Sequence, residues 1–145
     1  MKELVSIIIP SFNKQDFIGE CVQSVVDQVY ENWELIIIDD ASTDLTKNVL
    51  NEFDKNIKIK TIYLKKNKGP SFCRNLGVRE ANGTYVAFLD ADDFWTKDKL
   101  VDQINFMKNN DYKFTFSDYF TFKGKKTNEI IRKTNITDYF DYQSF

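Results

Sequence analysis

The chain contains no histidine among its 145 residues. This excludes Ser-His-Asp and Cys-His catalytic devices, and it excludes zinc sites with histidine ligands. Cys21 and Cys73 are the only cysteines, too few for a zinc site made of cysteines alone, and we expect two reduced, half-buried thiols. The five glycines form neither a Gly-x-Gly-x-x-Gly nor a Gly-x4-Gly-Lys-Ser/Thr loop. A bound nucleotide would therefore be held without a glycine-rich cradle.

The chain also lacks an excess of either charge. Lys and Arg number 20, Asp and Glu number 22, and the net charge of −2 argues against a nucleic-acid partner. No apolar stretch approaches the ~18 residues of a membrane span, and the start of the chain shows no signal-peptide pattern. With 42% hydrophobic and 29% charged residues, the composition is typical of one soluble globular domain. We expect a cytoplasmic protein.

Segments typical of strands and of helices alternate along the chain. Apolar, β-branched runs predict strands at Leu4–Ile9, Trp33–Ile38, Ile57–Leu64 and Tyr85–Leu89. The run at Ile57–Leu64 alternates with polar residues, which favours a place near a sheet edge, whereas the other runs are typical of strands buried on both faces. Helical periodicity covers residues 18–29, 45–53, 71–81 and 100–107. This order predicts an α/β fold with a doubly wound, mostly parallel sheet.

The pattern changes after the last of these helices. The segment Tyr112–Phe116 indicates a further strand. Residues 119–122 and 127–131 flank Lys123-Gly124-Lys125-Lys126, a sequence that predicts a C-terminal hairpin. Residues 134–145 are rich in Tyr and Phe but show no clear period.

Unusual residues follow several of the predicted strands, at the edge where open α/β sheets bind ligands. The first strand leads into Pro10-Ser11-Phe12-Asn13, and acidic loops follow the second and fourth strands. We expect five aspartates of these acidic loops to crowd one rim, namely Asp39, Asp40, Asp90, Asp92 and Asp93. Such a cluster repels itself unless a cation or hydrogen-bond donors compensate it. Hard oxygen ligands in an open site suit Mg²⁺ or Mn²⁺.

Each of these features also has a purely structural explanation. Ser42 or Asp44 could cap the second helix. Asp92 and Asp93 could belong to a solvated loop, since an Asp-x-Asp pair alone is weak evidence. Arg74, at the positive end of the third helix, could meet an anion or a base, or it could form a surface salt bridge.

The segments that carry these residues resemble the inverting family 2 glycosyltransferases of the GT-A fold. They are VSIIIPSFN from Val5, LIIIDDASTD from Leu35, GPSFCRNLG from Gly69 and AFLDADD from Ala87. The match covers roughly residues 4 to 118 in unbroken order, and it is specific for the family but not for the sugar. It implies a nucleotide-sugar-binding core at 1–118, followed at 119–145 by the start of an acceptor region.

The resemblance also implies residue roles on the base side of the donor. The backbone around Pro10 and Ser11 and the ring of Phe12 would line the nucleotide base. Asp40 would accept the N3 proton of uracil if the donor is a UDP-sugar, and Arg74 would contact the base or neighbouring donor groups.

On the sugar side, the resemblance implies that Asp90 binds the ribose. Asp92 would hold the Mg²⁺ or Mn²⁺ that bridges the diphosphate, and Asp93 would flank the donor sugar. The implied acceptor is a saccharide or a lipid-linked molecule of cell-surface polysaccharide synthesis, with peripheral membrane association of the full-length protein.

The family's general base comes from sequence beyond the acidic loop. Late carboxylates are Asp118, Glu129, Asp138 and Asp141, and none lies in the family's base motif. We therefore expect a truncated enzyme that binds the donor, lacks its base and self-associates through exposed C-terminal aromatic residues. The alternatives are a non-catalytic nucleotide-sugar-binding module and, more distantly, a response-regulator-like domain, whose acidic pair would follow the first strand rather than the second.

Overall fold

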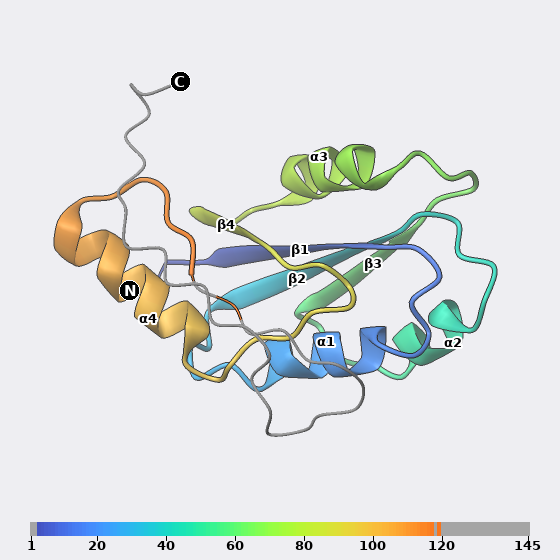
Figure 1. Cartoon of the computed structure of the whole chain (residues 1–145), viewed down its shortest axis with the longest axis horizontal. Helices are drawn as coiled ribbons and strands as arrows, with labels where there is room; N and C mark the ends of the chain where they lie inside the picture. Colours follow the sequence, from blue (N-terminus) through green and yellow to red (C-terminus); the bar gives the residue numbers. More distant parts are fainter. Residues whose placement is uncertain (1–2, 118, 120–145) are drawn as a thin grey trace. The chain divides into compact units, whose positions relative to one another are not determined.

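We analysed a computed structural model of the chain, which describes residues 3–117 and 119. Strands and helices alternate through this part of the chain (Figure 1). The elements are β1 (Val5–Ser11), α1 (Ile18–Val26), β2 (Trp33–Asp39), α2 (Thr46–Asn51), β3 (Ile59–Tyr63), α3 (Pro70–Glu80), β4 (Tyr85–Phe88) and α4 (Lys99–Asn110). The predicted α/β fold is confirmed.

The strands form a parallel sheet with the order β3-β2-β1-β4. The central strand β1 pairs with β2 and β4, so that Ile7 lies beside both Leu35 and Ala87. The isoleucines of β1 and β2 are buried, which explains why these runs lack polar alternation. β3 lies at one edge, as its alternating sequence predicts.

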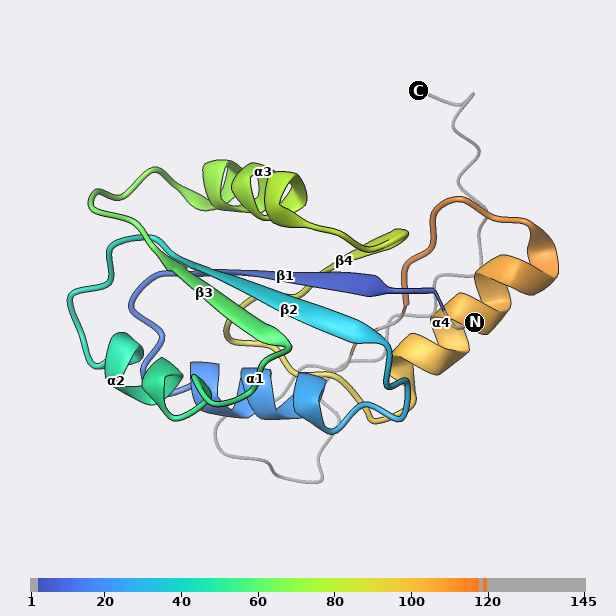
Figure 2. The same cartoon turned by 180° about the vertical axis from the view of Figure 1, so that it is seen from behind.

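Helices cover both faces of this sheet. Figures 1 and 2 show α1 and α2 on one face and α3 on the other. α3 lies so close to β1 that a Cβ atom added to Gly77 would come within 2.4 Å of Ile8 Cγ2. Cys73 of α3 packs with Ile36 and Ile38 of β2 on the same face.

The strand order places a topological switch point between β1 and β4. The chain moves from β1 through β2 to β3 in one direction and then returns to the other side of β1. Ligands of open α/β sheets bind beyond the carboxyl ends of the strands at such a point. A ligand-binding site is therefore expected at the loops that follow β1 and β4.

The prediction that the fourth strand is buried on both faces is wrong. β4 pairs only with β1 among the described strands, and Val86 and Phe88 are 40% and 48% exposed. These side chains share the register of Ser6 and Ile8, but α3 packs mainly against β1 and β2. An apolar run without polar alternation fits an uncovered edge strand as well as a central one.

The chain divides into two compact units, Met1–Asp102 and Gln103–Phe145. In the second unit, the expected strand Tyr112–Phe116 does not form within the described residues. A strand needs a hydrogen-bonded neighbour, and the described sheet consists of β3, β2, β1 and β4 without this segment. The predicted hairpin and aromatic tail lie outside the described residues, and the boundary at residue 118 stays a prediction.

No helix in the described part of the chain is long and apolar enough to cross a membrane. Cys21 and Cys73 are free, as expected, and are fully buried rather than half-buried.

Glu34 of β2 joins the start of the sheet to the turn between α3 and β4. Its Oε1 accepts hydrogen bonds from Ser6 Oγ at 2.5 Å and from the Asn82 backbone N–H at 2.6 Å. The Gly83 N–H donates to Ser6 Oγ at 2.8 Å, and a Cβ atom at Gly83 would come within 2.6 Å of the Ser6 backbone nitrogen. Partial burial acts to raise the pKa of Glu34, but the hydrogen bonds outweigh it and lower the pKa.

We expect Glu34→Gln to reduce the free energy of unfolding by about 1–2 kcal/mol at neutral pH, since it weakens charge-assisted hydrogen bonds. The lowered pKa means that this contribution is present above the unfolded-state value of about 4.3 and is lost as the pH falls through the folded-state pKa. Urea unfolding at several pH values measures it. The exposed Glu31→Gln is the control, and an equal effect of both substitutions would contradict the role of Glu34.

Candidate functional site

The end of β1 opens the candidate site. Ser11 is 2% exposed, and its hydroxyl has no hydrogen-bond partner in the described part of the structure. The next residue, Phe12, is 44% exposed. Asn13 has a positive φ of 51° and is fixed to the loop after β2, because its N–H donates to Ser42 Oγ and its Oδ1 accepts from the Thr43 N–H. An exposed ring thus stands at the carboxyl end of the central strand on a pinned loop.

The two consecutive aspartates at the end of β2 accept hydrogen bonds from different loops. Asp39 is the last residue of β2, and its carboxylate accepts hydrogen bonds from the N–H and the hydroxyl of Ser42. Asp40 is directed toward the start of α3, where its carboxylate accepts the N–H groups of Lys68 and Gly69 at 2.7 and 2.8 Å. Asp39 therefore holds the loop that follows β2, whereas Asp40 holds the turn that precedes α3.

Asp40 is 3% exposed and lies beside the Cys73 thiol. Burial and the neighbouring Asp40 carboxylate raise the pKa of Cys73 to about 11. Cys73 is therefore a protonated core residue and not a nucleophile.

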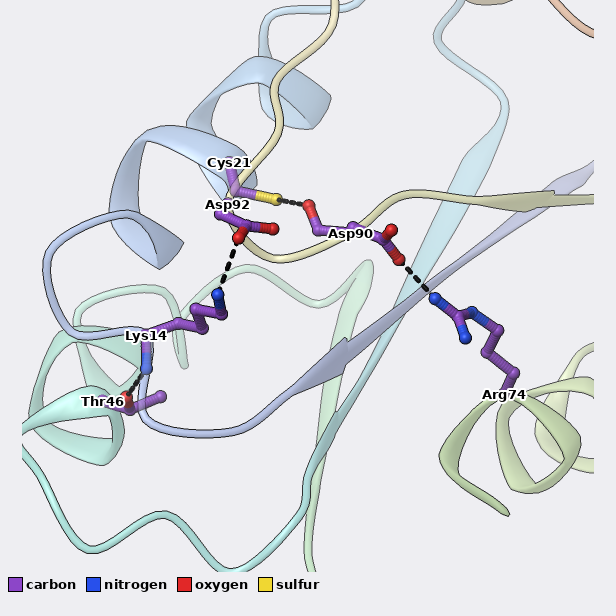
Figure 3. A network of polar contacts seen from close by, with 6 residues as sticks. All are labelled: Lys14, Cys21, Thr46, Arg74, Asp90 and Asp92. Carbon is purple, nitrogen blue, oxygen red and sulfur yellow. Dashed lines mark hydrogen bonds and ion pairs between the residues drawn. The ribbon is translucent and has the colours of Figure 1, made fainter. Parts of the chain in front are cut away.

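Asp90, in the loop after β4, forms an ion pair with Arg74 of α3. Arg74 Nη2 lies 2.5 Å from Asp90 Oδ1, and both side chains are partly exposed (Figure 3). The backbone carbonyl of Asp90 accepts a weak hydrogen bond from Cys21 Sγ of α1 at 3.5 Å. The surface salt bridge considered for Arg74 is thus formed, and its partner is another predicted site residue.

Asp92 forms a second ion pair, with Lys14 of the loop after β1. Lys14 Nζ lies 2.6 Å from Asp92 Oδ2 (Figure 3). The hydrogen bond and the charge of Lys14 lower the pKa of Asp92. Lys14 is the site residue that the sequence analysis missed. The available signal was its position directly after Asn13, in a loop that must lie next to the acidic loop if β1 and β4 are neighbours.

Asp93 is the remaining carboxylate of the acidic loop. Partial burial raises its pKa, and the nearby carboxylates of Asp92 and Asp90 raise it further. Its environment therefore has a deficit of positive charge, which a cation would correct.

The five aspartates expected on one rim differ in burial, and donors or cationic side chains compensate most of them. Asp39 and Asp40 are buried and accept hydrogen bonds from different loops, whereas the loop after β4 carries the exposed carboxylates. The compensating groups are backbone N–H donors, Ser42, Lys14 and Arg74.

Within the described residues, no group of at least three acidic or cysteine side chains is arranged to hold a metal ion. The donor set at Asp92 and Asp93 nevertheless fits Mg²⁺ or Mn²⁺. These ions typically bind one or two carboxylates together with substrate phosphates, and need no complete protein cage. The chemistry of these residues therefore fits a metal that arrives with a diphosphate.

Comparison with known proteins assigns this fold and these loops to a family. The model of the glycosyl transferase family 2 matches residues 6–144. The chain belongs to this family. The predicted resemblance is confirmed.

Two similar proteins are named as glycosyltransferases. The chain is 46% identical over 119 residues to TuaG of Bacillus subtilis (strain 168), provisionally named as a teichuronic acid biosynthesis glycosyltransferase. It is 42% identical over 120 residues to WfaP of Escherichia coli, a UDP-Glc:α-D-GlcNAc-diphosphoundecaprenol β-1,3-glucosyltransferase. Each alignment covers 81% of this chain and 47% of the relative, so the chain spans about half the length of these relatives.

A solved structure shows the same fold. The crystal structure of residues 1–349 of Staphylococcus aureus TarS in complex with UDP has a TM-score of 0.69 and 31% sequence identity. The similarity covers 75% of this chain and 32% of that one. TarS 1–349 has also been solved in complex with UDP-GlcNAc.

Proposed function

We propose that this chain is the donor-binding part of a glycosyltransferase that uses a UDP-sugar. The observation that carries the proposal is the arrangement at the switch point, where the acidic loop after β4 forms ion pairs with Lys14 and Arg74 and the exposed Phe12 follows β1. The UDP donor of WfaP and the UDP complex of TarS support this choice of nucleotide. We further propose a saccharide or lipid-linked acceptor, because the acceptor of WfaP is lipid-linked.

The base and ribose are assigned to the α3 side of the switch point. The Phe12 ring and the backbone of Pro10 and Ser11 would line the base. Asp40 would accept the uracil N3–H, since a carboxylate has about four lone-pair sites and the two backbone N–H groups fix its orientation. Arg74 would contact the base or neighbouring donor groups, and Asp90 would bind the ribose hydroxyls.

The diphosphate and sugar are assigned to the rest of the acidic loop. Asp92 would hold Mg²⁺ or Mn²⁺, and Asp93 would flank the donor sugar. When bound, the divalent ion supplies Lewis-acid stabilisation of the negative charge that develops on the leaving diphosphate. Inversion requires that an acceptor hydroxyl attack the anomeric carbon from the face opposite this diphosphate, while a general base removes the hydroxyl proton.

The assignment of Asp40 predicts a preference for uracil. Cytosine has no N3 proton, so the parent chain should bind UDP more tightly than CDP in the presence of Mn²⁺. Asp40→Ala should weaken UDP binding by about 1.5–3 kcal/mol, the range for a hydrogen bond to a charged group, with little effect on CDP. Calorimetric titration of both nucleotides measures the two affinities.

Asp54→Ala, which removes a carboxylate beyond α2, is the control and should leave both affinities unchanged. Circular dichroism of Asp40→Ala tests whether the loop that Asp40 holds remains folded. Equal affinities of the parent chain for UDP and CDP would show, without any variant, that Asp40 does not recognise the base.

A further inference from the structure

Lys14 spans the switch point of the sheet. It lies in the loop between β1 and α1, while its partner Asp92 lies in the loop between β4 and α4. The pair thus connects the two strand ends between which the ligand of an open α/β sheet is expected.

The backbone of Lys14 is held by hydrogen bonds, and its partly exposed side chain lies between Asp92 and the Phe17 ring, whose centroid is 6.0 Å from Nζ. The Lys14 N–H donates to Thr46 Oγ1 at 2.8 Å (Figure 3). The preceding residue, Asn13, is bonded to Ser42 and Thr43. The Lys14 side chain is 33% exposed and that of Asp92 is 46% exposed. The ammonium group can therefore leave Asp92 by side-chain rotation while the loop stays in place.

A second ion pair, between a lysine and a glutamate, provides a comparison for the pair of Lys14 and Asp92. Lys60 of β3 and Glu80 of α3 approach to 2.7 Å, with side chains 58% and 36% exposed. No ligand role is proposed for either residue. Lys14, in contrast, neutralises the one carboxylate to which the proposed function assigns a metal ion.

We propose that Lys14 is the built-in counter-ion of the donor site, which occupies Asp92 until a divalent cation and a nucleotide diphosphate arrive together. This inference rests on the proposed function. A bare cation must displace the ammonium group and then stand beside its unpaired positive charge. A cation that arrives with a diphosphate brings a negative group that can receive the ammonium. Lys14 therefore makes the binding of metal and of nucleotide depend on each other.

The removal of Lys14 tests this coupling without any assay of transfer. We expect Lys14→Gln to bind Mn²⁺ alone about 3- to 10-fold more tightly than the parent, the range for loss of a partly exposed competing charge. UDP should then strengthen Mn²⁺ binding less in Lys14→Gln than in the parent, and by linkage Mn²⁺ should strengthen UDP binding less. The electron paramagnetic resonance signal of free Mn²⁺, with and without saturating UDP at low ionic strength, gives these constants.

Two variants serve as controls. Lys14→Arg keeps the ion pair and should behave as the parent does. Lys60→Gln removes a lysine of similar geometry away from the site and should leave Mn²⁺ binding unchanged. A merely structural role of Lys14 would make Lys14→Gln bind Mn²⁺ more weakly, not more tightly.

An affinity for Mn²⁺ alone that is equal or lower in Lys14→Gln overturns the counter-ion role, and so does the absence of bare Mn²⁺ binding in both chains. The proposed function fails separately, if the parent chain shows no Mn²⁺-dependent binding of UDP. Intact binding of UDP with Mn²⁺ in the parent, together with unchanged coupling in Lys14→Gln, would reject the role of Lys14 alone.

Discussion

Asp92→Asn should abolish the Mn²⁺-dependent part of UDP binding while the fold stays intact. The substitution removes the charge of the proposed metal ligand and leaves the Lys14 ammonium group unpaired at the same place. Both changes disfavour a cation. Loss of a charged contact worth about 1.5–3 kcal/mol corresponds to roughly a 10- to 150-fold loss of affinity. The fold should persist, because partly exposed ion pairs contribute only about 0–1 kcal/mol to stability.

Calorimetric titration of UDP with and without Mn²⁺ separates the two parts of the binding. Asp98→Asn is a matched control, because it removes the same charge from the same loop and asparagine is accepted at the start of a helix as readily as aspartate. The control should keep the full effect of Mn²⁺. If Asp92→Asn keeps it as well, the metal is held elsewhere and the assignment of Asp92 is wrong.

The central strands β1 and β2 were predictable because a strand that is buried on both faces is apolar at nearly every position. The isoleucine runs of β1 and β2 have no polar residue at alternate positions, and both are buried in the middle of the sheet. The polar alternation of β3 predicted its edge position. The periodic apolar positions between the strands predicted helices, because α1, α2 and α3 each bury only part of their surface.

The arrangement of the acidic residues was only partly predictable. The apolar run of the expected second strand ends at Ile38, whereas β2 extends to Asp39. Asp39 therefore ends the strand and accepts hydrogen bonds from Ser42, whereas Asp40 begins the next loop and accepts the N–H groups of Lys68 and Gly69. The difference arises because a strand's last residue depends on its neighbours: Asp39 lies beside Ser11 of β1 and Tyr63 of β3.

The sequence placed Lys14 after the end of the first strand but did not identify its partner, because its contact with Asp92 is set by tertiary structure. It is separated from Asp92 by 78 positions in the chain, and the two meet only because β1 and β4 are neighbours. The same lack of local signal explains the error at β4. Val86 and Phe88 are apolar, but their apolar character does not determine whether a helix covers them.

We expect the 145-residue polypeptide, assayed by itself, to bind UDP with Mn²⁺ but to transfer sugar poorly. It spans 47% of the length of WfaP, and the described residues of the site are assigned to the donor. Loss of a general base alone typically slows a reaction by about 10²–10⁴-fold. Loss of acceptor positioning removes the proximity contribution in addition. Turnover should therefore be lower by at least this factor than that of a full-length relative.

The assay supplies UDP-sugars and a panel of saccharide and lipid-linked acceptors, with full-length WfaP as the positive control and Asp92→Asn as the blank for hydrolysis. Binding of UDP is measured on the same preparation, so that an inactive but folded chain is distinguished from an unfolded one. Transfer at a rate close to that of WfaP would contradict the prediction. It would mean that a carboxylate among Asp118, Glu129, Asp138 and Asp141 acts as the base, and replacing each by its amide would identify which one, since only that variant should lose kcat and keep its affinity for UDP.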